Sequence, residues 1–122
     1  MNNKKQQNIQ SEKTLTEIFK YNAGGEASEY HIIIHSTKPE DTYEEQLNAV
    51  LNTYDNLLAK ELKGGVAVFK RYFLSDAANQ ADTLLALTTE GSDCALSIVE
   101  QPPLDGTKIA LWVYLQTDIQ TQ

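Results

Sequence analysis

The chain has 122 residues, of which 41% are hydrophobic, and this is enough for one domain with one ordinary core. Its net charge of -7 at pH 7 would repel a phosphate backbone, which argues against a nucleic-acid partner. The single cysteine cannot form a disulfide within the chain, and without clustered cysteines and histidines we expect neither a metal nor another cofactor. No apolar run is long enough to span a membrane, so we expect a cytoplasmic protein without a membrane partner.

The N-terminus is polar and rich in amide side chains. It lacks the apolar segment of a secretory signal, and residues 1–12 are therefore expected to be a disordered leader. A single domain is expected at residues 13–118, followed by a short tail at residues 119–122.

Two strands are predicted after the leader. Residues 15–21 alternate apolar and polar side chains and end at a turn-forming NAGG, which predicts an edge strand. Residues 30–36 are rich in β-branched side chains and predict a second strand, expected to form a hairpin with the first. His31 and His35 share a face of this strand, but at the usual strand rise they lie about 13 Å apart, too far to bind one metal ion.

A helix is predicted from a capping box at Thr42 and Glu45. In this motif the threonine hydroxyl accepts from the backbone of the glutamate, and the glutamate carboxylate accepts from the backbone of the threonine. The apolar residues that follow have helical spacing and form one stripe: Leu47, Val50, Leu51, Tyr54, Leu57, Leu58 and Leu62. Gly64 and Gly65 are expected to end the helix.

The C-terminal half reads as a strand, a shorter helix and two further strands. Residues 66–75 contain no turn residue and predict a strand. Asp76 can cap a helix at residues 77–89. Residues 94–115 contain two alternating runs on either side of a Pro-Pro turn, which predicts a β-hairpin.

The order of these elements is strand, strand, helix, strand, helix, strand, strand. It predicts an α+β fold in which both helices pack on one face of a single mixed sheet. If the strands that flank the long helix lie parallel in that sheet, the crossover rule fixes their connection as right-handed.

Three segments carry a resemblance to a known family: VFKRYFLSD at residues 68–76, EQL at residues 45–47 on the capped helix, and LSIVEQPPLDGTKIALWVY at residues 96–114. Together, over residues 44–115, they resemble the RidA/YjgF superfamily. The resemblance implies a chorismate-mutase-like fold and a homotrimer with small-molecule sites in the clefts between subunits. The enzymatic branch of that family hydrolyses reactive enamines and imines to keto acids and ammonia.

The chain departs from this family at the site residues. In the enzymatic branch, an arginine of the penultimate strand binds the substrate carboxylate through a two-pronged, charge-assisted pair. That position falls on Ala95, and the positions of the usual glutamate fall on Ala110 and Trp112. Ser97 replaces a common cysteine, and the loop before the first helix is shortened to residues 37–42. The resemblance therefore implies a divergent member without the usual arginine and glutamate.

Arg71 is the only arginine and the first candidate for an anion-binding role. Alternation gives its strand one face with Ala67, Phe69, Arg71 and Phe73, and another with Val66, Val68, Tyr72 and Leu74. Arg71 could replace the missing arginine from a different strand, or it could form an inter-subunit salt bridge with a carboxylate such as Glu100, which is the commoner use of such residues. Lys70 interrupts the second face and marks either a bulge or a lysine with a packed stem.

Ser97, Trp112 and Tyr114 complete the candidate ligand-binding set. Trp112 and Tyr114 share a face with the small Ala110, where they could line an apolar pocket with the Ser97 hydroxyl for orientation. The two aromatic side chains could equally fill the core of a trimer, since large aromatics are enriched at the buried centres of interfaces.

Three functions are compatible with these residues. The first is a RidA-like homotrimer that binds a small metabolite between subunits without the usual deaminase residues. The second is an enamine or imine deaminase that uses Arg71 as a relocated anion-binding residue, so whether the protein is an enzyme stays open. The third is a structural trimer that binds no ligand.

Overall fold

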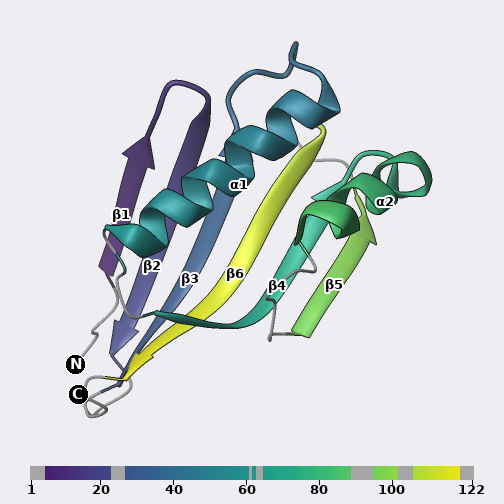
Figure 1. Ribbon diagram of the computed structural model, residues 1–122. Coiled ribbons are helices and arrows are strands. Elements are labelled where there is room, and N and C mark those ends of the chain that lie inside the picture. Colours follow the sequence, from purple (N-terminus) through teal and green to yellow (C-terminus); the bar gives the residue numbers. More distant parts are fainter. Residues whose placement is uncertain are drawn as a thin grey trace.

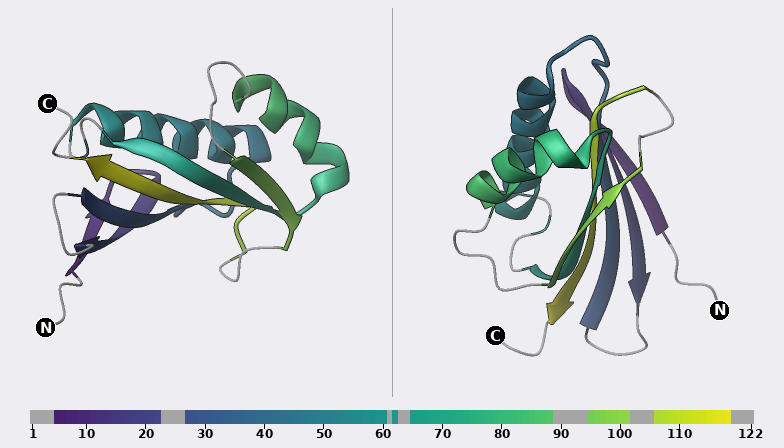
Figure 2. Two further views of the ribbon diagram at one scale, coloured as in Figure 1. Left: turned by 90° about the horizontal axis from the view of Figure 1, so that it is seen from below. Right: turned by 90° about the vertical axis from the view of Figure 1, so that its right-hand side faces the viewer.

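The computed structural model of the chain describes residues 5–22, 27–60, 62, 65–88, 95–101 and 106–118. In chain order its elements are β1 (Lys5–Gln10), β2 (Thr14–Asn22), β3 (Ala27–Ser36), α1 (Tyr43–Ala59), β4 (Val66–Leu74), α2 (Ala77–Thr88), β5 (Ala95–Glu100) and β6 (Ile109–Asp118). The strands form one six-stranded sheet in the order β1-β2-β3-β6-β4-β5. Figure 1 and Figure 2 show both helices on the same face of this sheet.

The sheet is mixed, as the order of elements predicts. β4 and β5 pair in parallel, whereas β6 pairs antiparallel with both β3 and β4. Since both strands that flank α1 run opposite to β6, they run parallel to each other on its two sides. The predicted α+β fold with both helices on one face is confirmed. In the described part of the chain, neither helix is both long and apolar enough to cross a membrane.

The prediction for the N-terminus is wrong from residue 5 onward. β1 lies within the expected leader and pairs antiparallel with β2, from Lys5 opposite Lys20 to Gln10 opposite Leu15. The segment around residues 15–21 is therefore not an edge strand. An amide-rich strand can join a sheet through its backbone hydrogen bonds, which a prediction based on side-chain hydrophobicity does not register. Residues 1–4 and 119–122 lie outside the described residues.

The predicted hairpin at residues 94–115 is also wrong. Both of its strands exist, but β4 lies between β5 and β6 in the sheet. β5 instead pairs in parallel with β4, to which α2 connects it. Alternation along a strand identifies its two faces but does not identify its neighbour, so the short spacing between the two runs was misleading.

A bulge at Val68 corrects the predicted faces of β4. Ala67 pairs with Leu115 and Phe69 pairs with Tyr114, so Val68 is the extra residue on its strand. Ala67 therefore shares the helix-covered face with the buried Leu115, whereas Val66 is 66% exposed and Val68 is 42% exposed. From Phe69 onward the predicted alternation holds. Lys70 stays on the helix-covered face, where its ammonium lies 4.7 Å from the centre of the Tyr54 ring.

The core lies between α1 and the sheet. The capping box that starts α1 is confirmed, because the Thr42 side chain accepts from the Glu45 backbone and the Glu45 carboxylate accepts from the Thr42 backbone. These hydrogen bonds lower the pKa of Glu45. Members of the predicted stripe are buried against alternate residues of the central strands: Leu47, Val50, Tyr54, Leu57 and Leu62 against Ile32, Ile34, Leu111, Val113 and Leu115.

A buried amide ties the loop before α1 to the start of β6. Gln46 is fully buried, and its Nε2 donates to the backbone oxygens of Lys38 and Asp41 at 3.1 and 2.9 Å. Its Oε1 accepts from the Lys108 backbone N–H at 2.8 Å. The Lys108 ammonium also donates to the backbone oxygen of Asp41, at 3.0 Å. One buried side chain therefore connects the loop before α1 to the residue that precedes β6.

Replacing Gln46 should destabilise the fold more than its size suggests. Gln46→Leu keeps most of the volume but removes the partner of the Lys108 N–H and one of the two donors to each of the Lys38 and Asp41 carbonyls. The free energy of unfolding should therefore fall by about 1 to 3 kcal/mol. Urea unfolding followed by circular dichroism measures this change. Asn52→Ala, at an exposed position of α1, is the control and should stay within about 0.5 kcal/mol of the parent. Equal stabilities of the two variants would contradict the role of Gln46.

Tyr43 links the two helices. Its hydroxyl donates to the backbone oxygen of Gln80 in α2 at 3.0 Å. Burial raises the pKa of Tyr43 from 10.0 to about 12, because a phenolate would lose its hydration there. The hydrogen bond and the burial both favour the neutral form in the folded state.

The raised pKa of Tyr43 predicts a loss of stability at alkaline pH. Below pH 10 the hydroxyl is protonated in both states, whereas between pH 10 and about 12 it ionises only in the unfolded chain. The free energy of unfolding should therefore fall with rising pH across this range, and it should fall less in Tyr43→Phe. Urea unfolding at both ends of the range tests this, and an identical fall in the two proteins would refute it.

Candidate functional site

The candidate site lies on the face of the sheet opposite α1 and α2, which we call the open face. Figure 2 shows this face without a covering helix. Strand pairing places several half-buried apolar side chains there, namely Leu15, Phe19, Ile33, Phe69, Phe73, Val99, Trp112 and Tyr114. A sheet face this rich in apolar groups is typical of a surface that another layer covers.

One cross-strand row of the open face contains most of the predicted residues. Arg71 on β4 pairs with Trp112 on β6 and with Ser97 on β5, and Trp112 pairs in turn with Ile33 on β3. Since paired residues project from the same face, the four side chains stand side by side across four strands. The tertiary structure thus brings Arg71, Ser97 and Trp112 together.

A cavity of about 300 Å³ is centred on this row. Among the described residues, Ile33, Arg71, Phe73 and Trp112 line it, so the charged group of this set is a guanidinium beside three apolar side chains. The Nε atom of Arg71 is buried and has no hydrogen-bond partner among the described residues. A buried donor without a partner is costly, and such groups are rare in folded proteins.

In the part of the chain that the structure describes, the recorded neighbours of the Arg71 guanidinium are aromatic rings and not a carboxylate. Its Cζ lies 5.2 Å from the ring centre of Phe69 and 5.9 Å from that of Trp112. The two rings lie 5.5 Å apart in an edge-to-face arrangement, with 67° between their planes. The two distances from the guanidinium to the ring centres are within the range of cation–π attraction.

Glu100, offered as a partner for an inter-subunit salt bridge of Arg71, lies away from Arg71 within the chain, and a salt bridge between subunits stays a prediction. Glu100 pairs with Leu74, a fully buried residue of the helix-covered face, and its carboxylate accepts from the Ala77 N–H at 3.0 Å. A carboxylate at this position stabilises the N-terminus of α2. The Asp76 carboxylate, predicted to cap this helix, accepts from the Asn79 side chain at 2.7 Å. Glu100 and Arg71 thus lie on opposite faces of the sheet.

Tyr114 lies in the next row and does not line the cavity. Its ring stacks on His31 with 5.1 Å between ring centres, and its hydroxyl accepts from the Gln116 side chain at 3.1 Å. His31 also contacts Tyr21 and Trp112, with ring centres 5.5 and 5.6 Å away. His31 is therefore part of an aromatic cluster. Across the described residues, no group of three or more His, Cys, Asp or Glu side chains could hold a metal ion.

Two lining residues, Ile33 and Phe73, were missing from the predicted set. Phe73 could have been found, because it lies two residues after Arg71 on the same strand face. Ile33 could not, because its position depends on the pairing of β3 with β6. Ser97 is half-buried beside Arg71 but is not a lining residue, and Ala95, where the resemblance places an arginine, pairs with Phe69 one row away.

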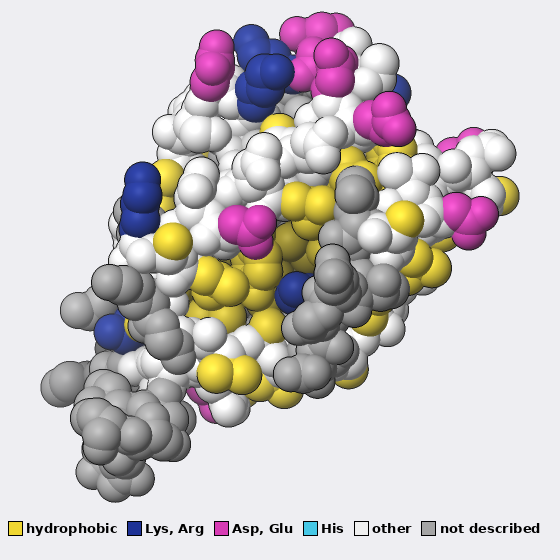
Figure 3. Space-filling model, in the orientation of Figure 1, with side chains coloured by type: hydrophobic (Ala, Val, Ile, Leu, Met, Phe, Trp, Pro, Cys, Tyr) yellow, Lys and Arg dark blue, Asp and Glu magenta, His cyan; other side chains and the backbone are white. Residues whose placement is uncertain are grey.

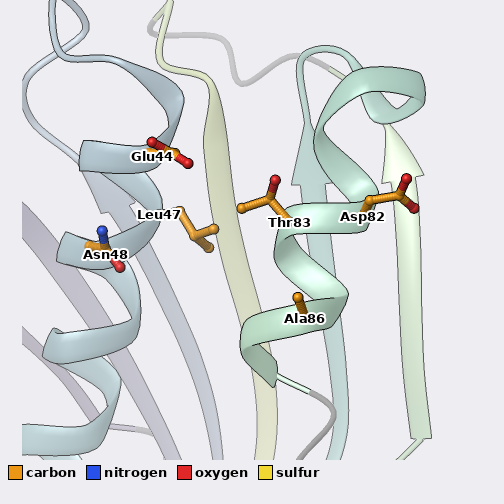
Figure 4. A pocket seen from close by; sticks show the side chains of 6 residues that line it. All are labelled: Glu44, Leu47, Asn48, Asp82, Thr83 and Ala86. Atoms are coloured by element: carbon orange, nitrogen blue, oxygen red, sulfur yellow. The ribbon is translucent and has the colours of Figure 1, made fainter.

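A second cavity, of about 510 Å³, lies between the two helices. Figure 3 shows the helix-covered face, where hydrophobic side chains lie at the bottom of a hollow. Figure 4 shows the residues that line the cavity, which are Glu44, Leu47, Asn48, Asp82, Thr83 and Ala86. The carboxylate of Glu44 points toward the gap, whereas that of Asp82 points away from α1. None of these described lining residues has a buried polar side-chain atom without a hydrogen-bond partner, so they offer no counterpart to the Nε of Arg71.

Comparison by sequence identifies no relative: neither a protein-family model nor a curated protein matches the chain. Comparison by structure finds a similar fold. A solved structure described as a "putative translation initiation inhibitor from Salmonella typhimurium" matches with a TM-score of 0.59, over 93% of this chain and 97% of that one. The chain has a YjgF/RidA-like fold. The fold implied by the resemblance is confirmed, and at 16% identity the match concerns the fold alone.

The environment of Arg71 predicts that it contributes little to stability. Arg71→Met keeps an unbranched side chain against the rings and removes the unpartnered N–H, so the free energy of unfolding should change by less than about 1 kcal/mol. Lys70→Met, at the neighbouring position on the other face, loses the contact with Tyr54 and should be destabilised by about 0.5 to 1 kcal/mol. Urea unfolding at one protein concentration measures both. A loss above about 2 kcal/mol in Arg71→Met would show that Arg71 is a structural residue.

Proposed function

We propose that this chain is a RidA/YjgF-like cytoplasmic protein that assembles as a homotrimer and binds a small carboxylate metabolite at Arg71. The observation that carries the proposal is the position of Arg71 in the wall of a cavity whose other described lining residues are apolar, together with a buried Nε that has no partner among the described residues. A ligand carboxylate would supply the missing hydrogen-bond acceptor and the missing counter-charge together.

The chemistry of the cavity favours a carboxylate with an apolar substituent. A guanidinium offers donors in a planar fork that matches a carboxylate, and its charge does not depend on pH in the physiological range. The remaining lining residues, Ile33, Phe73 and Trp112, would contact the apolar part of the ligand. The volume of about 300 Å³ lies at the small end of the usual range for ligand sites.

The open face supports assembly. The side chains around Arg71 are only half-buried in the isolated chain, although they include Phe69, Phe73 and Trp112. The resemblance implies that copies of the chain cover such a face in a trimer and that ligand sites lie in the resulting clefts. In that arrangement a neighbouring subunit would exclude water from the cavity and strengthen the pairing of Arg71 with an anion.

Deamination of enamines or imines is the second candidate function. It is favoured by the position of Arg71 in the wall of a cavity, where a substrate carboxylate could bind. Hydrolysis also needs a group that positions or activates water, and the four lining residues include no carboxylate, histidine or lysine that could do so. The positions of the usual glutamate carry Ala110 and Trp112. Binding without catalysis is therefore the preferred proposal.

Calorimetric titration with pyruvate and with 4-methyl-2-oxopentanoate tests the binding proposal. We expect the branched compound to bind more tightly, and Arg71→Ala to weaken its binding by about 10- to 100-fold, because a charge-assisted pair is lost. Lys60→Ala removes a charge from an exposed position after α1 and should bind like the parent. Size-exclusion chromatography with light scattering measures the assembly. A monomer, or an Arg71→Ala variant that binds as well as the parent, would refute the corresponding part of the proposal.

An imine-hydrolysis assay separates the two functions. An amino-acid oxidase generates the imine of a branched 2-oxo acid in solution, and release of the oxo acid is followed with and without the protein. We expect no acceleration from a folded trimer. Acceleration that disappears in Arg71→Ala would establish the deaminase function instead.

A further inference from the structure

We infer that Phe69 and Trp112 are positioning residues that hold the Arg71 guanidinium in place for an anion. The inference rests on the proposed carboxylate site and adds the means by which its arginine is kept available. Trp112 is the cross-strand partner of Arg71, and Phe69 precedes Arg71 by two residues on the same strand face. The rings approach the guanidinium from two different elements, with edge-to-face geometry between them.

Ring contacts hold the guanidinium in a way that a carboxylate could not. A carboxylate partner would occupy the N–H donors and neutralise the charge, and a ligand anion would then have to displace it. An aromatic ring attracts the cation through its π face and leaves the N–H donors at the edge of the plane unused. Arg71 thus stays ordered and charged, and less conformational entropy is lost when the anion binds.

Replacement of Phe69 tests the positioning role more directly than replacement of Trp112. Trp112 lines the cavity and would contact the ligand itself, so its replacement changes two things at once. Phe69 is not among the four lining residues, and its ring reaches the site through its contact with Arg71. An effect of Phe69 on carboxylate affinity would therefore be indirect, exerted through the guanidinium or through Trp112, whose ring Phe69 also contacts.

The experiment is a calorimetric titration of the full-length protein with 4-methyl-2-oxopentanoate. We expect Phe69→Leu to bind about 3- to 10-fold more weakly than the parent, because a cation–π contact is lost. Phe69→Tyr restores a ring and should bind within about twofold of the parent. Phe19→Leu is the matched control, since Phe19 lies in the same cross-strand row as Phe69 but on β2, three strands away.

The variants distinguish failure of the inference from failure of the proposed site. If Phe69→Leu binds like the parent, or if Phe69→Tyr binds as weakly as Phe69→Leu, the positioning role is wrong although the carboxylate site stands. If Arg71→Ala binds like the parent, the site itself is wrong. Equal weakening by Phe19→Leu would point to a general effect on the open face and would also overturn the inference. Phe69→Met, which lacks a ring, replaces Phe69→Leu if that variant does not fold.

Discussion

The pairing of β6 with both β3 and β4 is the constraint on which the rest of the structure depends. It places Trp112 between Ile33 and Arg71 on the open face, and it places Leu111 and Val113 under α1 on the other. The same strand therefore supplies the centre of the core and the centre of the candidate site. Gln46 fixes where β6 begins, because its buried amide binds the backbone just before the strand. A slip of one residue in β6 would exchange its core-facing and site-facing side chains.

Local signals in the sequence predicted the elements well and their partners poorly. The capping box at Thr42 and Glu45 and the apolar stripe of α1 were sufficient because they depend on contacts within one helix and on one buried face. The strand at residues 5–10 was missed because its pairing uses the backbone, and the hairpin at residues 94–115 was misassigned because the strand between its halves comes earlier in the chain. The bulge at Val68 was not predicted either, since an apolar residue there fits regular alternation.

The candidate site was predictable to the extent that it depends on a single strand. Arg71 and Trp112 were identified from their chemistry and their strand faces, and the structure places them side by side. Ser97 lies next to Arg71 but outside the cavity lining, and Tyr114 belongs to the cluster around His31. The contribution of Ile33 depends on a cross-strand neighbour far away in the chain, and so does the contact between Phe69 and Trp112. Such neighbours are set by the topology of the sheet, which no local pattern specifies.

The adjacency of Ala95 and Phe69 has a consequence for how sites on β-sheets are compared. Arg71 lies one strand and one row from the position at which the resemblance places an arginine. A long, flexible side chain can reach nearly the same point in space from either position. A comparison position by position with the resemblance registers only that Ala95 carries no charge, whereas the folded sheet has a cation on the neighbouring strand. In a β-sheet, neighbouring strands can present a group to nearly the same place, and a comparison of single positions does not register this.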